Sequence, residues 1–171
     1  MKKVILLTMS IFILSGCVTL VAVNETSFRN IAVKDKAYKQ SNFLTIDACH
    51  FAYAFGTEQT AKFSKANCAL TDKQLIVYSA TKSGMLLKKL VYLDYNNIKG
   101  VCFPKLSRGG QVQLKTNKGV IALTVGGKNI QDLGLNEKYY KIIKQHRVKD
   151  FKSPYMIFSP PEPVVIVMPV M

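Results

Sequence analysis

The sequence has no tryptophan and few acidic residues. Its 171 residues include 10 Asp and Glu against 24 Lys and Arg, which gives a formal net charge of +14. The carboxylates are scattered singly, so no pair is spaced for acid–base catalysis or for a hard metal ion. The motifs of serine hydrolases and phosphate-binding glycine loops are also missing. The sequence therefore predicts no catalytic site, no metal and no cofactor.

The length and composition indicate a single small domain with added terminal segments. About half of the residues, 49%, are hydrophobic, which is enough for a buried core and excludes wholesale disorder. The basic excess is compatible with nucleic acid, an anionic membrane surface or an acidic polymer as partner. The N-terminal residues narrow this choice.

The first 17 residues have the features of a lipoprotein export signal. Lys2 and Lys3 precede the apolar run 4–14, which is too short for the roughly 20 residues of a spanning helix. Residues 14–17 (Leu-Ser-Gly-Cys) resemble the lipobox of bacterial lipoproteins. The resemblance implies removal of residues 1–16 and acylation of Cys17, for example with palmitate. The alternative is an ordinary secretion signal with a chance cysteine.

Lipidation would anchor the protein to a membrane without inserting the chain. The residue after Cys17 is Val18, not the Asp that marks inner-membrane retention in enterobacterial lipoproteins, so we expect the outer membrane with the domain facing the periplasm. Residues 17–42 are predicted to be a lipidated tether with a short helix around 27–38. Export argues against nucleic acid as a partner.

The body of the chain, residues 43–148, alternates short β-type runs with turn residues. The connections are too short for crossovers, which predicts antiparallel pairing. A helix should follow, with Asn136 as its N-cap and an apolar face that includes Tyr139 and Ile143. The predicted strands are residues 47–55, 63–70, 74–80, 86–93, 98–103, 111–115 and 120–125.

Three segments, in this order, resemble GRAM and other pleckstrin-homology-like domains. Residues 69–79 (Ala-Leu-Thr-Asp-Lys-Gln-Leu-Ile-Val-Tyr-Ser) are similar to a hairpin of that family, 93–101 to the segment after it, and 111–125 to the strands before its last helix. The resemblance covers about 43–146. It implies a mainly β (α+β) fold: a partly open seven-stranded antiparallel barrel or sandwich capped by a C-terminal amphipathic helix. Residues 56–60 contain no basic residue, unlike the first loop of inositol-phosphate binders, which counts against phosphoinositide binding.

Three cysteines remain beside Cys17, an odd number for an oxidising compartment. If the first two predicted strands form a hairpin centred between residues 58 and 59, Cys49 lies directly opposite Cys68 and a disulfide is feasible. The alternative is a pair of buried free thiols. We expect Cys102 to be a small core residue.

The basic residues are dispersed over strand ends, turns and the polar side of the predicted helix. One interpretation is an ordinary solvated surface. The functional interpretation is a basic surface that meets anionic headgroups or acidic envelope polymers. The candidate contact residues are Lys88, Lys89, Lys105, Arg108, Lys138, Lys141 and Lys144.

Residues 149–171 form a proline-rich, apolar C-terminal tail. The run 164–168 is Val-Val-Ile-Val-Met and is flanked by prolines, so it suits an extended arm or an edge strand better than a helix. The tail either packs on its own domain or adds a strand to an envelope protein partner through residues 160–171.

Together these features favour a lipid-anchored lipoprotein of the cell envelope. We expect a non-catalytic binding or scaffold module at the membrane surface, with a protein or an anionic headgroup as partner. The alternative is an envelope-modifying hydrolase whose site is assembled from dispersed residues. Loss of Lys2 and Lys3 with the signal leaves 22 basic and 10 acidic residues, so the mature chain keeps a net charge of +12. The sequence does not specify an oligomeric state.

Overall fold

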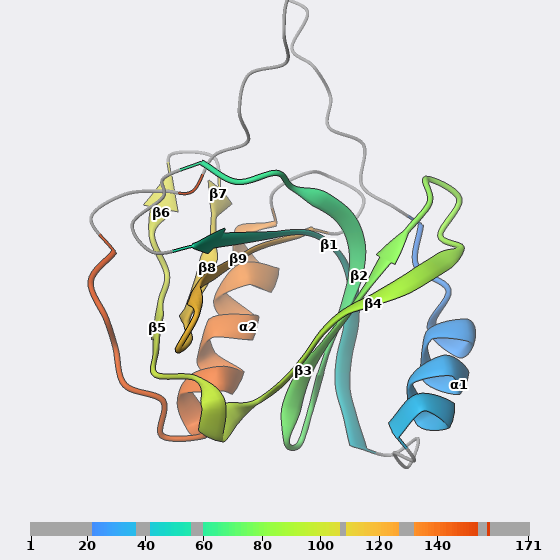
Figure 1. Ribbon diagram of the computed structural model, residues 1–171, viewed down its shortest axis with the longest axis horizontal. Coiled ribbons are helices and arrows are strands. Elements are labelled where there is room, and N and C mark those ends of the chain that lie inside the picture. The colour runs from blue at the N-terminus through green and yellow to red at the C-terminus, as the bar shows by residue number, and fades with distance from the viewer. Residues whose placement is uncertain are drawn as a thin grey trace, which may run out of the picture.

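The fold is a bent antiparallel sheet with one helix on each face (Figure 1). It is taken from a computed structural model. The sequence-predicted sites at Cys17, Arg108 and 160–171 lie outside the residues that the structure describes. The described residues are 22–36, 42–55, 60–106, 109–126, 132–153 and 157.

The main sheet has seven strands in the order β4-β3-β2-β1-β9-β8-β5, and every neighbouring pair is antiparallel. β4 and β5 are its two edges, so the sheet is partly open. The predicted mainly β, seven-stranded fold class is thus confirmed. A short two-stranded ribbon, β6 with β7, was not predicted. The strands are β1 (Phe43–Phe55), β2 (Ser64–Thr71), β3 (Gln74–Ala80), β4 (Leu86–Asp94), β5 (Gly100–Cys102), β6 (Lys105–Leu106), β7 (Gly109–Gly110), β8 (Val112–Lys115) and β9 (Gly119–Gly126).

The first strand belongs to both halves of the sheet. β1 pairs with β2 from Phe43 to Phe51 and with β9 from Ala48 to Phe55. The prediction that this strand begins at residue 47 was wrong, because residues 43–46 continue it. Phe43 and Ile46 pack under the N-terminal helix, a contact that hydrophobic alternation along the strand alone does not reveal.

The C-terminal helix α2 (Leu133–Gln145) begins earlier than predicted. Its N-cap is Asp132, whose carboxylate accepts a hydrogen bond of 3.0 Å from the backbone N–H of Leu135. Asn136 was wrongly predicted to be the cap. It is buried in the helix, and its side chain accepts from the N–H of Val125 (2.8 Å) and donates to the C=O of the same residue (2.6 Å). The amide therefore ties α2 to the end of β9.

The main core lies between α2 and the concave face of the sheet. Tyr139 and Ile143, the predicted apolar face of the helix, are fully buried. The hydroxyl of Tyr139 donates to the C=O of Cys68 at 3.1 Å, so burial of this phenol leaves no unpaired polar atom. The strands supply most of the remaining core side chains, among them Leu70, Leu75, Val77, Val101, Leu114, Ile121 and Leu123.

The N-terminal helix α1 (Glu25–Lys36) covers the opposite, convex face of the sheet. It begins two residues before the helix predicted around 27–38. Phe28 and Ala32 are fully buried there. At the end of the helix, Asp35 accepts a 2.6 Å hydrogen bond from the hydroxyl of Tyr78 on β3. In the described part of the chain neither helix has the length and hydrophobicity that crossing a membrane requires.

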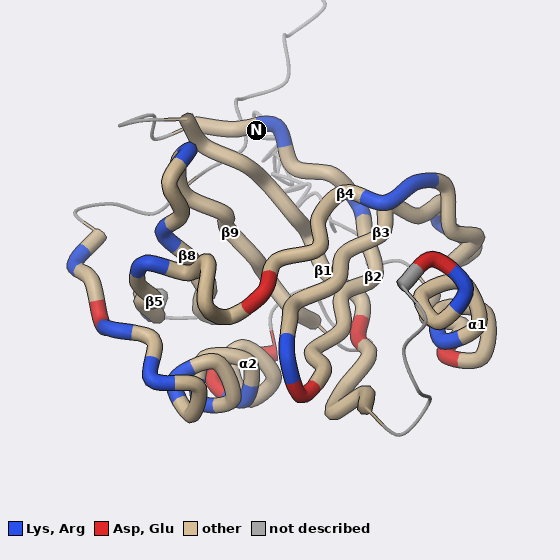
Figure 2. Tube along the Cα trace, turned by 60° about the horizontal axis from the view of Figure 1, so that its bottom comes forward, with Lys and Arg blue, Asp and Glu red and all other residues tan. Residues whose placement is uncertain are grey.

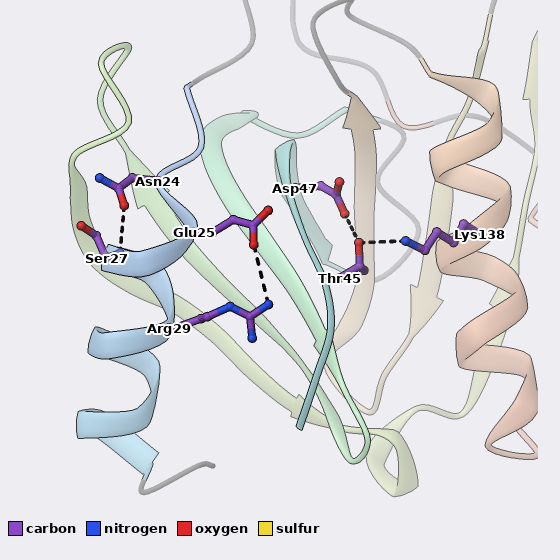
Figure 3. Close-up of polar contacts among 7 residues, drawn as sticks. All are labelled: Asn24, Glu25, Ser27, Arg29, Thr45, Asp47 and Lys138. Atoms are coloured by element: carbon purple, nitrogen blue, oxygen red, sulfur yellow. Dashed lines mark hydrogen bonds and ion pairs between the residues drawn. The ribbon is translucent and has the colours of Figure 1, made fainter. Parts of the chain in front are cut away.

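The first turn of α1 is closed by its own side chains (Figure 3). The side chain of Asn24 accepts from the N–H of Ser27 at 2.9 Å, as N-cap residues do. Glu25 and Arg29, one turn apart, form an ion pair of 3.6 Å. The acidic group of this turn therefore has a basic partner within the helix.

The chain after α2 runs back along the sheet. The C=O of Lys149 accepts from the N–H of Val101 at 2.8 Å, and the N–H of Phe151 donates to the C=O of Val101 at 3.2 Å. Further on, Ile157 is buried against small residues of β1 and β9, and both of its backbone polar groups bond to the side chain of Gln111. The described part of the predicted tail thus packs on the domain, while strand addition through 160–171 stays a prediction.

Candidate functional site

The first described residue, Ala22, lies against the turn between β3 and β4. Its N–H donates to the C=O of Lys82 at 3.4 Å, and its C=O accepts from the side chain of Asn67 at 3.5 Å. Figure 1 shows the tip of this hairpin beside the start of α1. The N-terminal segment therefore joins the domain at the tip of an edge hairpin.

Gly84 allows this close approach. Its φ is +87°, a left-handed conformation that favours glycine, and a Cβ atom at this position would lie 2.4 Å from the carbonyl oxygen of Ala22. The turn is held by hydrogen bonds from the N–H of Thr81 to the C=O of Met85 (2.9 Å) and from the N–H of Gly84 to the C=O of Thr81 (3.0 Å). The hairpin tip thus has a defined shape on which Ala22 packs.

The hairpin tip combines exposed apolar and basic side chains. Met85 and Leu87 are 62% and 60% exposed. Lys82, Lys88 and Lys89 beside them are exposed as well. No acidic residue occurs between positions 73 and 93. We call residues 81–89, together with the exposed Val23, the hairpin surface.

A hollow of about 360 Å³ separates this hairpin from α1. Polar and apolar side chains of both elements line it. The lining residues are Asn24, Ser27, Ile31, Ser83, Gly84, Met85 and Leu86.

The other predicted basic contacts lie elsewhere in the fold. Lys105, on the β6–β7 ribbon, is exposed, with its ammonium 5.5 Å from the ring centre of Phe103. Figure 2 shows basic positions spread over α2, the region of β5 and β8, and the region of β4 and α1. Of the described members of the predicted set, Lys88 and Lys89 alone belong to the hairpin surface, so these members do not form one continuous patch.

The helix lysines are engaged with acidic or polar groups of the domain. Lys141 pairs with Glu137 at 3.0 Å, and Lys144 pairs with Asp150 at 2.9 Å. The Lys141 ammonium, by hydrogen bond and charge, lowers the pKa of the Glu137 carboxyl. The hydrogen bond from Lys144, followed by one from the Tyr140 hydroxyl, likewise lowers the pKa of the Asp150 carboxyl. These lysines present less free positive charge than their number suggests.

Lys138 is also held by a polar contact across the fold (Figure 3). Its ammonium donates to the hydroxyl of Thr45 on β1 at 3.2 Å, and that hydroxyl donates to Asp47 at 2.5 Å. The lysine is thus linked through a hydroxyl to a carboxylate. Each of the three helix lysines therefore has a polar or acidic partner within the domain.

The structure joins Cys49 and Cys68 in a disulfide, with their Cα atoms 6.0 Å apart. The predicted register was wrong by two residues, because Cys49 faces Ala66 and Cys68 faces Asp47. The bond is therefore diagonal between β1 and β2, not directly across them. Its two residues belong to the main core.

The remaining described cysteine, Cys102, is a free thiol that is partly buried. Burial raises the pKa of this thiol to about 11. At neutral pH it is protonated, and a protonated thiol is a poor nucleophile.

A second, polar cavity of about 690 Å³ lies at the far end of α2. It opens between the β2–β3 turn, the short 3₁₀ helix η2 (Tyr95–Asn97) and the helix end. The ring of His146 stacks on that of Tyr95, with centroids 3.9 Å apart and planes 22° apart. The sequence pattern gives no sign that Tyr95 and His146, which are 51 positions apart, lie in contact. The cavity is lined by Asp72, Lys73, Asp94, Tyr95, Asn96, Asn97 and His146.

The two histidines have different surroundings. His50 lies on β1 opposite Lys65, and burial, with a smaller contribution from the Lys65 charge, lowers its pKa. His146 lies at the end of α2 against Tyr95. Among the described residues, no group of three or more His, Cys, Asp and Glu side chains could hold a metal ion.

Comparison with known proteins concerns the fold alone. No protein-family model and no curated protein matches the chain. A domain of an unknown protein from Leishmania infantum is 15% identical with a TM-score of 0.45, over 71% of this chain and 96% of that one. The N-terminal PH domain of human ARAP2 is 9% identical with a TM-score of 0.42, over 64% of this chain and 86% of that domain.

A third solved structure is similar over a longer stretch. The hSac2 domain of the human phosphoinositide phosphatase Sac2 is 12% identical with a TM-score of 0.40, over 88% of this chain and 98% of that domain. The assignment of this chain to the predicted mainly β class therefore depends on its own strand order and on the position of α2.

Proposed function

We propose that this protein is a lipid-anchored lipoprotein of the bacterial cell envelope whose domain is a non-catalytic binding or scaffold module at the membrane surface. The observation that supports the anchor is the lipobox-like sequence of residues 14–17, and the position of Ala22 determines how close that anchor would hold the domain. Ala22 lies five residues after Cys17 and already packs on the domain. A fully extended chain of that length spans at most about 17 Å. Acylation of Cys17 would therefore hold the domain against the membrane.

The charge of the chain agrees with this location. The mature chain would carry 22 basic and 10 acidic residues, and bacterial envelope membranes present anionic headgroups. Several acyl chains on one cysteine would make the attachment stable, whereas a single chain holds a protein only marginally. The anchor supplies membrane affinity, and the basic surface is available for an anionic headgroup or for an acidic protein surface.

Direct analysis of the N-terminus tests the anchor. We expect cells fed an alkyne analogue of palmitate to label the wild-type protein, and the mass of the N-terminal peptide to show a cleaved, acylated Cys17. Cys17→Ser should abolish labelling and leave an unprocessed precursor. Cys102→Ser, which changes the free thiol, should label normally. An unmodified Cys17 in protein recovered from membranes would overturn the proposal.

Sorting between the two membranes tests the proposed outer-membrane location. The wild-type protein should sediment with the outer membrane in a sucrose gradient. Val18→Asp should move it to the inner membrane, and Val18→Ala should leave it in place. A wild-type protein already in the inner membrane would contradict this part of the proposal.

A further inference from the structure

We propose that the hairpin surface, residues 81–89 with Val23, is the face that the domain lays on an anionic phospholipid bilayer. The inference rests on the proposed lipid anchor and adds to it the orientation of the domain. It names a lipid leaflet, not a protein, as the occupant of this surface.

The first argument is the position of the anchor. Cys17 can lie no farther than about 17 Å from Ala22, which is bonded to the hairpin turn at Lys82. Because Gly84 leaves no room for a side chain between the turn and Ala22, the chain and the hairpin tip meet closely. A membrane that holds Cys17 therefore lies within about 17 Å of Ala22 and of the hairpin turn that Ala22 contacts.

The second argument is the kind of side chain exposed there. Met85 and Leu87 are both more than half exposed, and Val23 is 37% exposed. Apolar side chains that project from a surface beside lysines are typical of segments that lie in the lipid interface. On the bilayer their apolar groups would leave water, whereas the isolated domain keeps them exposed.

The third argument is the charge of the same surface. Lys82, Lys88 and Lys89 lie within eight residues of one another, and no acidic residue occurs between positions 73 and 93. The acid of the adjoining helix turn, Glu25, is paired with Arg29. On α2, in contrast, Lys141 and Lys144 have acidic partners. The Lys89 ammonium lies 4.5 Å from the ring centre of Tyr92, but among the described residues no ion pair joins Lys82, Lys88 or Lys89 to an acid. The hairpin surface therefore offers positive charge without an acidic partner where the anchor places it.

A competing explanation comes from the sheet itself. β4 is an edge strand, and lysines on edge strands discourage pairing with another molecule. That explanation accounts for Lys88 and Lys89 but requires no contact between Leu87 and lipid. Depth measurements separate the two explanations.

The absence of tryptophan provides a clean probe. In the full-length protein, purified in its acylated form, Leu87→Trp introduces a single tryptophan in the hairpin surface. Leu44→Trp is the matched control, since Leu44 is 49% exposed and belongs to the start of β1, which follows the C-terminal end of α1 in the chain, whereas the hairpin surface adjoins the start of α1. Both variants are reconstituted into phosphatidylglycerol–phosphatidylethanolamine vesicles with brominated acyl chains.

The expected result is a blue-shifted emission and strong bromine quenching for Trp at 87, with neither change for Trp at 44. Equal quenching at the two positions, or none at 87, would overturn the inference and favour the edge-strand explanation. The mass of the reconstituted protein keeps the two proposals apart. If Cys17 is acylated and the tryptophan at 87 stays in water, the orientation alone fails, whereas an unacylated Cys17 removes the proposed function and the orientation with it.

Charge substitutions test the electrostatic part in the Leu87→Trp background. Lys82→Gln with Lys88→Gln should lower the ratio of docked to undocked domain roughly thirtyfold, since each lysine near an anionic surface contributes a factor of about five. Lys115→Gln with Lys118→Gln removes the same charge at the β8–β9 turn and should leave quenching unchanged. Vesicles of phosphatidylcholine should reduce quenching as the hairpin pair does. Equal losses from both lysine pairs would mean that net charge, not this surface, drives contact.

Discussion

The two helices lie on opposite faces of the same sheet, and they depend on it in different ways (Figure 1). α2 lies in the concave face, where Tyr139 and Ile143 are fully buried in the main core. α1 lies on the convex face and buries Phe28 and Ala32 in a smaller, separate cluster. Successive residues of β3 pack alternately in the α2 core and in the α1 cluster, because successive side chains of a strand point to opposite faces.

This difference in burial indicates that the two helices contribute differently to stability. The sheet cannot close its core without α2, since its concave apolar face would be open to water. α1 instead covers a face of a sheet that is already complete, and it connects that face to the N-terminal segment at Ala22. We therefore expect α2 to determine global stability and α1 to behave as a local unit, with smaller effects on the sheet.

The largest loss of stability is expected from a substitution in the core under α2. Tyr139→Ala should cost about 4 kcal/mol of unfolding free energy, because it empties a fully buried site. Phe28→Ala removes an equally buried ring from α1 and should speed hydrogen exchange in α1 with little change in the unfolding of the sheet. Urea denaturation followed by near-ultraviolet circular dichroism measures the first, and amide exchange the second. A single cooperative loss in both variants would contradict the comparison.

The next effect concerns the disulfide inside the α2 core. Cys49→Ser with Cys68→Ser opens a bond between residues 19 positions apart, and a loop of that length predicts a loss of about 3 kcal/mol. Thermal unfolding with and without reductant gives the size. Cys102→Ser is the control and should change stability by less than about 1 kcal/mol. If reductant leaves the wild-type unfolding temperature unchanged, the bond does not contribute as expected.

Smaller losses of stability are expected at the buried Asn136 of α2 and at the N-cap of α1. Asn136→Ala should cost about 2 kcal/mol, because both backbone groups of Val125 lose their partner in a buried place. Asn24→Ala removes the bond to Ser27 and should cost about 1 kcal/mol, confined to α1. Urea titration and helix-resolved exchange measure the two. Gln145→Ala, at an exposed position of α2, should be neutral, and a cost equal to that of Asn136→Ala would point to helix propensity instead.

The smallest expected effect is a gain at the end of α2. Arg147 has a φ of +62°, a left-handed conformation that costs a side-chain-bearing residue energy. Arg147→Gly should stabilise the domain by about 1 kcal/mol, as glycine does after a helix end. Urea midpoints compare it with Lys149→Gly, which should be destabilising because residue 149 has no positive φ for glycine to relieve and its C=O is held by the N–H of Val101 on β5, so that glycine only adds backbone freedom to the unfolded chain. Destabilisation by Arg147→Gly would show that its side chain contributes more than its backbone strain costs.

Parts of the fold were predictable where turn residues mark both ends of an element. β3 was predicted with its observed limits because Asp72 and Lys73 precede it and the sequence 81–84 follows it. Asn136 misled the prediction of the helix start. An asparagine before an apolar run is a common cap, but here its amide serves β9, a tertiary role that local sequence does not encode.

The pairing of residues between neighbouring strands was less predictable. The register of β1 against β2 differed by two residues because it depends on how many residues the connection takes up, which composition does not specify. The same limit applied to the site. The prediction included Lys88 and Lys89 but scattered them among lysines that have acidic partners in the fold, and it did not single out Met85 and Leu87. Exposure of an apolar side chain becomes visible once the neighbouring strands and helices are placed.

The contact between Ala22 and the hairpin turn has a mechanical consequence. A pull on the N-terminus first loads the two hydrogen bonds of Ala22, to Lys82 in the hairpin turn and to Asn67 on β2. Once those two bonds break, the load passes along the chain to α1, which is held by its smaller cluster on the convex face, before it reaches the strands that the Cys49–Cys68 bond joins. The domain would then respond to tension by releasing α1 from the convex face, while the core around α2 carries little of the load.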